Sequence, residues 1–121
     1  MRARKDGVII LISSTAGIRG VVTNIAYQVA KGALPQFARA LAREFANDNI
    51  RVNCVAPGVV RTAFHAAMTA DQRRLNLDHR IPLHREGTPA HVANLITELV
   101  TNDYLTGETF TIDGGLTMRI A

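Results

Sequence analysis

The sequence of 121 residues predicts an α/β fold in which about three parallel strands carry helices on their faces. Two observations predict it. Three short apolar runs, Val8–Ile12, Ile50–Ala56 and Thr109–Ile112, have the length of strands. The segments between them carry apolar residues at helical spacing, and parallel strands are joined by crossovers of this kind. We therefore expect the order strand, helix, strand, one or two helices and strand, in a single domain spanning residues 1–121.

The first run, Val8–Ile12, contains no polar residue, which indicates a strand buried on both faces. It ends at Ser13 and Ser14, and Gly17 and Gly20 mark the loop that follows. Ser14 is therefore expected at the carboxyl end of a strand. In open α/β sheets, ligands bind outside that end.

A long helix is predicted from Ala26 to about Asn47. Its apolar residues form two adjacent rows, which is wider than the ~100° stripe that covers one sheet. They are residues 29, 30, 33, 34, 37, 38, 41, 42 and 45. The surplus predicts a second packing partner, either another helix or another subunit. Pro35 removes the hydrogen bond to Lys31, so we expect the helix to bend or to restart there.

The second predicted strand ends at the turn Pro57-Gly58, and a weaker helical pattern follows it. The candidate short helices are Phe64–Met68 and Gln72–Leu77. A further helix is expected to begin at Thr88, because threonine is a good N-cap and Pro89 suits the first helical position.

Ser14, Tyr27 and Lys31 form the candidate catalytic set. Tyr27 and Lys31 are four residues apart, which puts them one turn apart on one helix face. A lysine ammonium at that distance favours the phenolate form of the tyrosine, which suits the tyrosine to proton transfer. A serine hydroxyl from the strand end can hydrogen-bond the carbonyl or alcohol oxygen on which the tyrosine acts. Taken alone, such a tyrosine and lysine pair is more often an ordinary solvated helix face.

Together with their neighbours, these residues resemble the short-chain dehydrogenase/reductase family. The order and spacing of the motifs agree with the family along nearly all of the chain. The matching stretches are Ile12-Ser13-Ser14-Thr15-Ala16-Gly17, Tyr27-Gln28-Val29-Ala30-Lys31, Arg51-Val52-Asn53-Cys54-Val55-Ala56-Pro57-Gly58 with Thr62, and Leu105-Thr106-Gly107 through Asp113-Gly114-Gly115. In the second stretch, Val29-Ala30 replaces the Ala-Ser that is common in the family before the lysine.

The resemblance implies a Rossmann-type, three-layer fold whose strands correspond to strands 5, 6 and 7 of the family's sheet. It also implies NAD(P)-dependent interconversion of small-molecule alcohols and ketones. Ser14 would bind the substrate oxygen, Tyr27 would transfer the proton, and Lys31 would support the tyrosine and hold the nicotinamide ribose. Further contacts with the NAD or NADP cofactor would come from Pro57, Gly58, Val60 and Thr62. In the family, the long helix typically packs against its counterpart across a dimer axis.

The family's phosphate-binding motif, Thr-Gly-x-x-x-Gly-x-Gly, has no counterpart among the nine scattered glycines of this sequence. The Asn-Asn-Ala-Gly stretch and the helix with the family's fourth catalytic residue, an asparagine, are also absent. The chain thus resembles the carboxyl-terminal half of a family member, and Met1–Asp6 would match the tail of the helix before the first strand.

Two functions therefore stay open. The first is a catalytic half that acts with a complementing amino-terminal half, supplied by a partner or a longer gene product. The second is a non-catalytic, dimeric scaffold or small-molecule binder. In either case the apolar Val8–Ile12 strand would lie at a sheet edge, which predicts a homo-oligomer such as a dimer.

Composition argues against several other functions. The net charge of +4 comes largely from dispersed arginines without a nucleic-acid-binding motif, so no nucleic-acid partner is expected. The four histidines, at positions 65, 79, 84 and 91, lack metal-ligand spacing, which predicts no metal site. His65 and His79 lie where the family has its substrate lid. Cys54 is the single cysteine and is expected to be a buried thiol. Without a run of 18 apolar residues, a cytoplasmic protein with no membrane partner is expected.

Overall fold

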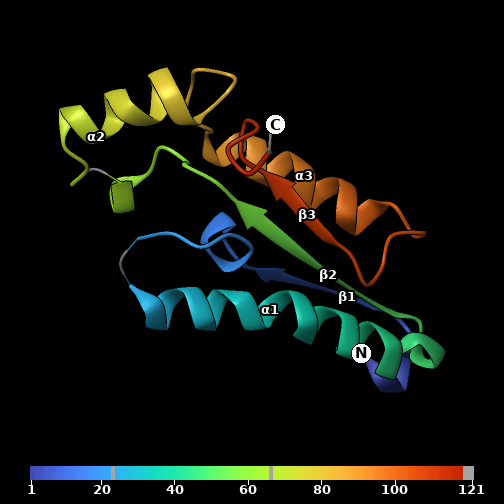
Figure 1. Ribbon diagram of the computed structural model, residues 1–121. Coiled ribbons are helices and arrows are strands. Elements are labelled where there is room, and N and C mark those ends of the chain that lie inside the picture. The colour runs from blue at the N-terminus through green and yellow to red at the C-terminus, as the bar shows by residue number, and fades with distance from the viewer. Residues whose placement is uncertain (23, 66, 119–121) are drawn as a thin grey trace.

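The computed structural model describes residues 1–22, 24–65 and 67–118. Three parallel strands form one sheet in the order β1-β2-β3 (Figure 1). They are β1, Gly7–Ile12; β2, Ile50–Pro57; and β3, Thr109–Ile112. The α-helices of the described residues are α1, Ile25–Glu44; α2, Ala70–Leu75; and α3, Pro89–Thr101. The predicted α/β fold with three parallel strands is confirmed, and each strand was placed to within one residue at either end.

The helices α1 and α3 cover opposite faces of the sheet (Figure 1). The core between α1 and the sheet is built from Ala38, Ala42, Ile50, Val52 and Cys54. Arg51, between two of these β2 residues, reaches the other face and donates to the carbonyl oxygens of Leu99 and Val100 in α3, at 2.7 Å each. Neighbouring residues of a strand point to opposite faces, so β2 contacts α1 on one face and α3 on the other. The sheet therefore lies between two helix layers.

Cys54 is fully buried in the core beneath α1, as the sequence predicted. Burial raises the pKa of its thiol, because the thiolate would lose its hydration there. The thiol is therefore a packing group in this fold.

Helix α1 begins at Ile25 and continues through Pro35 to Glu44, followed by a single 3₁₀ turn, Ala46–Asp48. Of the two alternatives predicted at Pro35, a bend or a restart, the restart is thus wrong. Packing explains the continuity, because Pro35 is buried together with Ala38 and Ala42 on the sheet side of the helix. The predicted surplus of apolar residues is present on the surface, since Val29 and Phe37 are 67% and 51% exposed, and Ile25, just before the predicted helix, is 78% exposed.

Strand β1 is less buried than the sequence predicted. Its residues are half-buried, and Ile12 is 41% exposed. The reason is its position: β2 pairs with one edge of β1, and within the described residues no strand pairs with the other. The prediction of a strand buried on both faces is wrong for this chain, whereas its place at the edge is confirmed.

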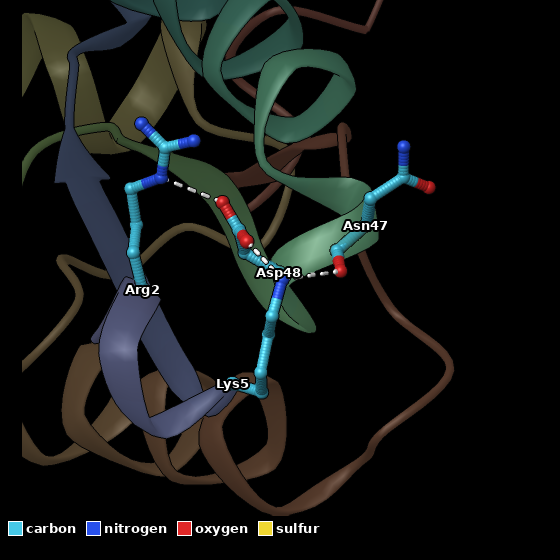
Figure 2. A network of polar contacts seen from close by, with 4 residues as sticks. All are labelled: Arg2, Lys5, Asn47 and Asp48. Atoms are coloured by element: carbon cyan, nitrogen blue, oxygen red, sulfur yellow. Dashed lines mark hydrogen bonds and ion pairs between the residues drawn. The ribbon is translucent and has the colours of Figure 1, made fainter.

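Two salt bridges hold the amino terminus against the turn between α1 and β2 (Figure 2). Arg2 Nε lies 2.7 Å from Asp48 Oδ2, and Lys5 Nζ lies 2.5 Å from Asp48 Oδ1. Lys5 also donates to the carbonyl oxygen of Asn47 at 3.3 Å. The helix tail predicted for Met1–Asp6 is a single 3₁₀ turn, Arg2–Arg4, ended by Lys5 in the left-handed region at φ 52°.

The segment between β2 and α3 holds short turns. A 3₁₀ turn covers Ala63–His65, α2 follows, and a π-helical turn, Asn76–Arg80, continues α2. The helix predicted at Phe64–Met68 lies partly outside the described residues, and the one predicted at Gln72–Leu77 lies mostly within α2. Helix α3 begins as predicted, with Thr88 as N-cap and Pro89 in the first turn.

Candidate active site

Ser14 lies directly beyond β1, at the carboxyl end of the sheet. Ser13 fixes this end of the strand: its backbone N–H donates to the Val55 carbonyl oxygen at 2.7 Å, and its Oγ donates to the Lys31 carbonyl oxygen at 2.7 Å. Gly17 lets the following loop reach α1, since a Cβ there would come within 2.7 Å of the Lys31 carbonyl carbon. The loop after β1 is therefore held against the turn of α1 that carries Lys31.

Tyr27 and Lys31 lie in the first two turns of α1. Asn24 is the N-cap, with φ 52°, and its side chain accepts from the Tyr27 N–H at 3.2 Å. The Gln28 side chain holds the preceding loop through both backbone groups of Val21, at 3.0 and 2.9 Å. Lys31 Nζ lies 5.8 Å from the centre of the Tyr27 ring and donates to the Ile12 carbonyl oxygen at 2.8 Å. The ammonium thus lies between the tyrosine and the carboxyl end of β1.

Ser14 and Tyr27 line one cavity of about 420 Å³, which we call the catalytic cavity. Its other walls are Thr15, Ala16, Val21, Asn24, Gln28, Gly58, Val59, His65 and Met68. Ser14 Oγ accepts from the Ala16 N–H at 3.2 Å, which leaves its own O–H to donate elsewhere. Within the described residues the Tyr27 hydroxyl makes no hydrogen bond, so both hydroxyls are available to a bound oxygen atom.

The predicted cofactor-binding residues at and beyond the end of β2 do not all line the same cavity. Gly58 lines the catalytic cavity and packs against Asp113, where a Cβ would come within 2.6 Å of the Asp113 side chain. Val60 lines a separate cavity of about 320 Å³ beneath the start of α3. Pro57 ends β2, and Thr62 is exposed beyond Val60.

Val60 has a backbone suited to an amide ligand. It forms an isolated parallel bridge with Gly87, in which Gly87 N–H donates to Val59 O and Arg61 N–H donates to Gly87 O, at 2.9 Å each. This pairing uses the groups on either side of Val60. Its own N–H and C=O make no hydrogen bond within the described residues, and together they match the donor and acceptor of a carboxamide.

Several residues of the site were not found by sequence reasoning. Ser13, Asn24 and Gln28 position the loop and helix through the contacts given above. Asparagine is a common N-cap, so Asn24 carried a readable signal, whereas nothing in the sequence marked the pairing of Gln28 with Val21. His65, which the sequence placed in a lid, lines the catalytic cavity, and the exposed His79 does not.

Comparisons with known proteins give the family of this chain. Residues 1–117 match the family described as enoyl-(acyl carrier protein) reductase. The chain belongs to the short-chain dehydrogenase/reductase family. It is 41% identical over 121 residues to a tropinone reductase homologue of Arabidopsis thaliana, and 40% identical over 116 residues to the human 3-oxoacyl-[acyl-carrier-protein] reductase. These matches cover 98% and 96% of this chain but 46% and 47% of the relatives.

Solved structures of the family have the same fold over this chain. The 3-oxoacyl-[acyl-carrier protein] reductase of Brucella melitensis superposes with a TM-score of 0.92 at 31% identity, covering 98% of this chain and 45% of that one. Similar structures contain nicotinamide cofactors: a 4-hydroxyisoleucine dehydrogenase mutant is complexed with NADH and succinate, and a putative 2-deoxy-D-gluconate 3-dehydrogenase from Agrobacterium tumefaciens has bound NADP. The chain thus spans about half the length of the family members that it matches.

Two further findings concern the described part of the chain. No helix there is long and apolar enough to cross a membrane. No group of three or more His, Cys, Asp or Glu side chains there is arranged to hold a metal ion.

Proposed function

We propose that this chain carries the proton-transfer machinery of an NAD(P)-dependent oxidoreductase that interconverts alcohols and ketones. The observation that carries the proposal is that Ser14 and Tyr27 line the same cavity, with the Lys31 ammonium one helical turn from the tyrosine. A hydrogen-bond donor, a proton donor and a fixed positive charge are the groups that carbonyl reduction needs.

In the reduction direction, the substrate carbonyl oxygen accepts hydrogen bonds from the Ser14 and Tyr27 hydroxyls. A nicotinamide cofactor, when bound, would supply the hydride that the carbonyl carbon accepts. Tyr27 gives its phenolic proton to the oxygen, which becomes the alcohol hydroxyl, and the Lys31 ammonium stabilises the phenolate that remains. In the oxidation direction, the phenolate takes the alcohol proton, so Tyr27 is the base.

The residues present fit the nicotinamide end of the cofactor. The N–H and C=O of Val60 suit the carboxamide, as described above. Lys31 Nζ has three donors, of which one reaches Ile12 O, so the others can serve the ribose hydroxyls. Pro57, Gly58 and Thr62 lie within three residues of Val60 in the sequence. The glycine-rich turn that holds a pyrophosphate in such folds is not in this sequence, so cofactor affinity rests on the nicotinamide end or on a complementing chain segment.

Titration of the purified chain with NADH and NADPH, followed by nicotinamide fluorescence, tests the cofactor part of the proposal. We expect saturable binding that falls when Lys31 is replaced by Met. Absence of binding at millimolar cofactor would favour the alternative of a non-catalytic binding or scaffold protein, unless a complementing segment restores it.

Where turnover is obtained, Tyr27→Phe tests the chemistry. The substitution removes only the phenolic hydroxyl, so we expect turnover to be lost while the fold and cofactor binding remain. Tyr104→Phe is the matched control, because Tyr104 is 95% exposed and lies outside the cavity. Turnover that survives in Tyr27→Phe would contradict the assigned role.

A further inference from the structure

A second cavity, of about 550 Å³, adjoins the catalytic cavity. We call it the arginine cavity, because Arg19 and Arg80 line it. The two cavities share three wall residues, Thr15, Val21 and Val59. A ligand that occupies both cavities therefore has Ser14 and Tyr27 in the wall at one end and Arg19 and Arg80 in the wall at the other.

Neither arginine of this cavity is neutralised by an acid. Arg19 Nε donates to the Thr117 carbonyl oxygen at 3.5 Å, and Arg80 Nη1 donates to Asn76 Oδ1 at 3.4 Å. Within the described residues neither Arg19 nor Arg80 forms an ion pair, since the ion pairs there involve Arg2, Lys5, Arg61, Arg73 and Arg74. No Asp or Glu is among the lining residues of either cavity. The two cavities together thus have an uncompensated positive charge on one side.

The local backbone sets Arg80 at the cavity wall. Arg80 ends the π-helical turn Asn76–Arg80, which continues α2 and is followed by extended Ile81. Asn76 is 7% exposed, lines the same cavity and accepts the hydrogen bond from Arg80 given above. A buried amide thus contacts the guanidinium, and within the described residues Arg80 makes no other side-chain hydrogen bond, so its remaining N–H donors can serve a ligand.

We infer that the substrate is a keto or hydroxy compound that also carries an acid group, carboxylate or phosphate. Arg19 and Arg80 bind the acid group in the arginine cavity, while the reacting oxygen lies at Ser14 and Tyr27. Guanidinium groups suit this role because their paired donors match the oxygens of carboxylates and phosphates. The inference rests on the proposed function for the position of the reacting oxygen, whereas the binding of the acid group depends on the two arginines alone.

The test is binding without cofactor and without turnover, so that its result is independent of the proposed chemistry. Isothermal titration of the full chain compares two matched pairs: levulinate with methyl levulinate, and dihydroxyacetone phosphate with dihydroxyacetone. Each pair differs in the acid group. We expect at least one anion to bind roughly tenfold or more tightly than its neutral counterpart, which corresponds to about 1.4 kcal/mol. The pair with the larger difference identifies carboxylate or phosphate as the preferred group.

Variants then assign the effect to the two arginines. Arg19→Gln and Arg80→Gln should each lower the affinity for the anion about tenfold, and Arg80→Lys should restore part of it. Arg43→Gln is the control, since Arg43 is exposed near the end of α1, at the opposite end of the sheet. Tyr27→Phe removes one hydrogen bond to the reacting oxygen of anion and neutral counterpart alike, so the ratio of their affinities should stay within about twofold of that of the parent chain. Circular dichroism verifies that each variant is folded.

Equal affinity for anions and neutral compounds, or anion binding that survives both Arg→Gln changes, would overturn the inference. Turnover of neutral ketones by the same chain would then leave the proposed function standing. Conversely, anion binding that depends on Arg19 and Arg80, without any turnover, would support the inference and count against the catalytic proposal.

Discussion

Two neighbouring serines at the end of β1 use their hydroxyls in different ways. Ser13 is 3% exposed, and its hydroxyl donates a hydrogen bond to the Lys31 carbonyl oxygen. This bond connects the end of β1 to α1. Ser14 Oγ accepts a hydrogen bond from the Ala16 N–H, so its own O–H can donate to a ligand in the catalytic cavity. Alternation along the chain therefore separates a structural hydroxyl from one that is open to a ligand, and only the second belongs to the candidate catalytic set.

Asn53 is a structural residue with a testable energetic role. It is fully buried in β2, donates from Nδ2 to the Leu105 carbonyl oxygen at 2.8 Å, and accepts on Oδ1 from the Glu108 N–H at 3.2 Å. Asn53→Leu leaves both backbone groups without a partner. We expect the free energy of unfolding to fall by about 1–3 kcal/mol in urea denaturation.

Asn47→Leu is the matched control for this change, because Asn47 is exposed and its side chain points away from the neighbouring polar contacts (Figure 2). Its unfolding free energy should stay within about 0.5 kcal/mol of the parent chain. An equal loss in both variants would show that the hydrogen bonds of Asn53 are not the cause.

At the scale of elements, Asp48 joins the amino-terminal turn to the start of β2 (Figure 2). Hydrogen bonds from Lys5 and Arg2 lower the pKa of Asp48 below its ordinary value of 3.8. A carboxyl whose pKa is lowered by folding stabilises the fold fully above its unfolded-state pKa, and this contribution is lost as the pH falls through the lower folded-state pKa. We therefore expect Asp48→Asn to be less stable than the parent chain at pH 7, with the difference shrinking as the pH falls below about 4.

Thermal unfolding across this pH range measures the effect of Asp48. Asp71→Asn is the control, since Asp71 is highly exposed and pairs only with Arg74 on its own helix. A difference between Asp48→Asn and the parent chain that stays constant with pH would contradict the assignment.

A second junction between elements depends on Glu86. Its side chain is 6% exposed and contacts Arg61 Nε at 2.9 Å and Arg73 Nε at 3.2 Å. Arg61 follows Val60, and Arg73 is on α2, so one carboxylate joins the predicted cofactor segment to α2. Both arginines are about half or more exposed, so each pair contributes under about 1 kcal/mol.

Glu86→Gln should therefore change local mobility more than global stability. We expect faster hydrogen exchange in residues 70–75 and in residues 59–62, with little change in the exchange of β2. Glu44→Gln, an exposed change at the end of α1, is the control. Unchanged hydrogen exchange in α2 would show that other contacts hold α2 in place.

The elements also show which features a single sequence predicts. Strands and the start of α3 follow from local signals, namely apolar runs and the Thr88-Pro89 cap. The continuity of α1 through Pro35 does not, because it depends on packing against the sheet. The two crossovers are a further case: with the strands in the order β1-β2-β3 and the helices on opposite faces, the two connections have opposite hands, whereas right-handed connections are the general rule.

The candidate site divides in the same way. Ser14, Tyr27 and Lys31 were found from residue type and spacing, because a strand end and a helical turn fix where such side chains lie. Arg19 and Arg80 were not, since they are 61 residues apart in the sequence and meet only when the loop after β1 and the π-helical turn border one cavity. Long-range juxtaposition of this kind has no local signal.

At the scale of the whole molecule, two apolar surfaces lack a partner within the described residues. One is the outer row of α1, with Ile25, Val29 and Phe37 exposed, and the other is the free edge of β1, where Ile12 is 41% exposed. The buried residues of α1 are Pro35, Ala38 and Ala42, so the exposed row lies on another side of this helix. Exposed apolar rows and free strand edges of this kind mark surfaces that associate with other chains.

We therefore predict that the chain forms a homo-oligomer through the outer row of α1. Light scattering coupled to size-exclusion chromatography should give a mass above the 13.2 kDa of one chain, and a dimer is the simplest closed assembly. Val29→Glu and Phe37→Glu place charges in the buried centre of such an interface, so each should shift the mass toward the monomer. Val100→Glu, an equivalent change at an exposed apolar residue of α3, should leave the mass unchanged. A stable monomer at micromolar concentration would contradict the prediction, and dissociation by Val100→Glu alone would move the interface to the opposite face.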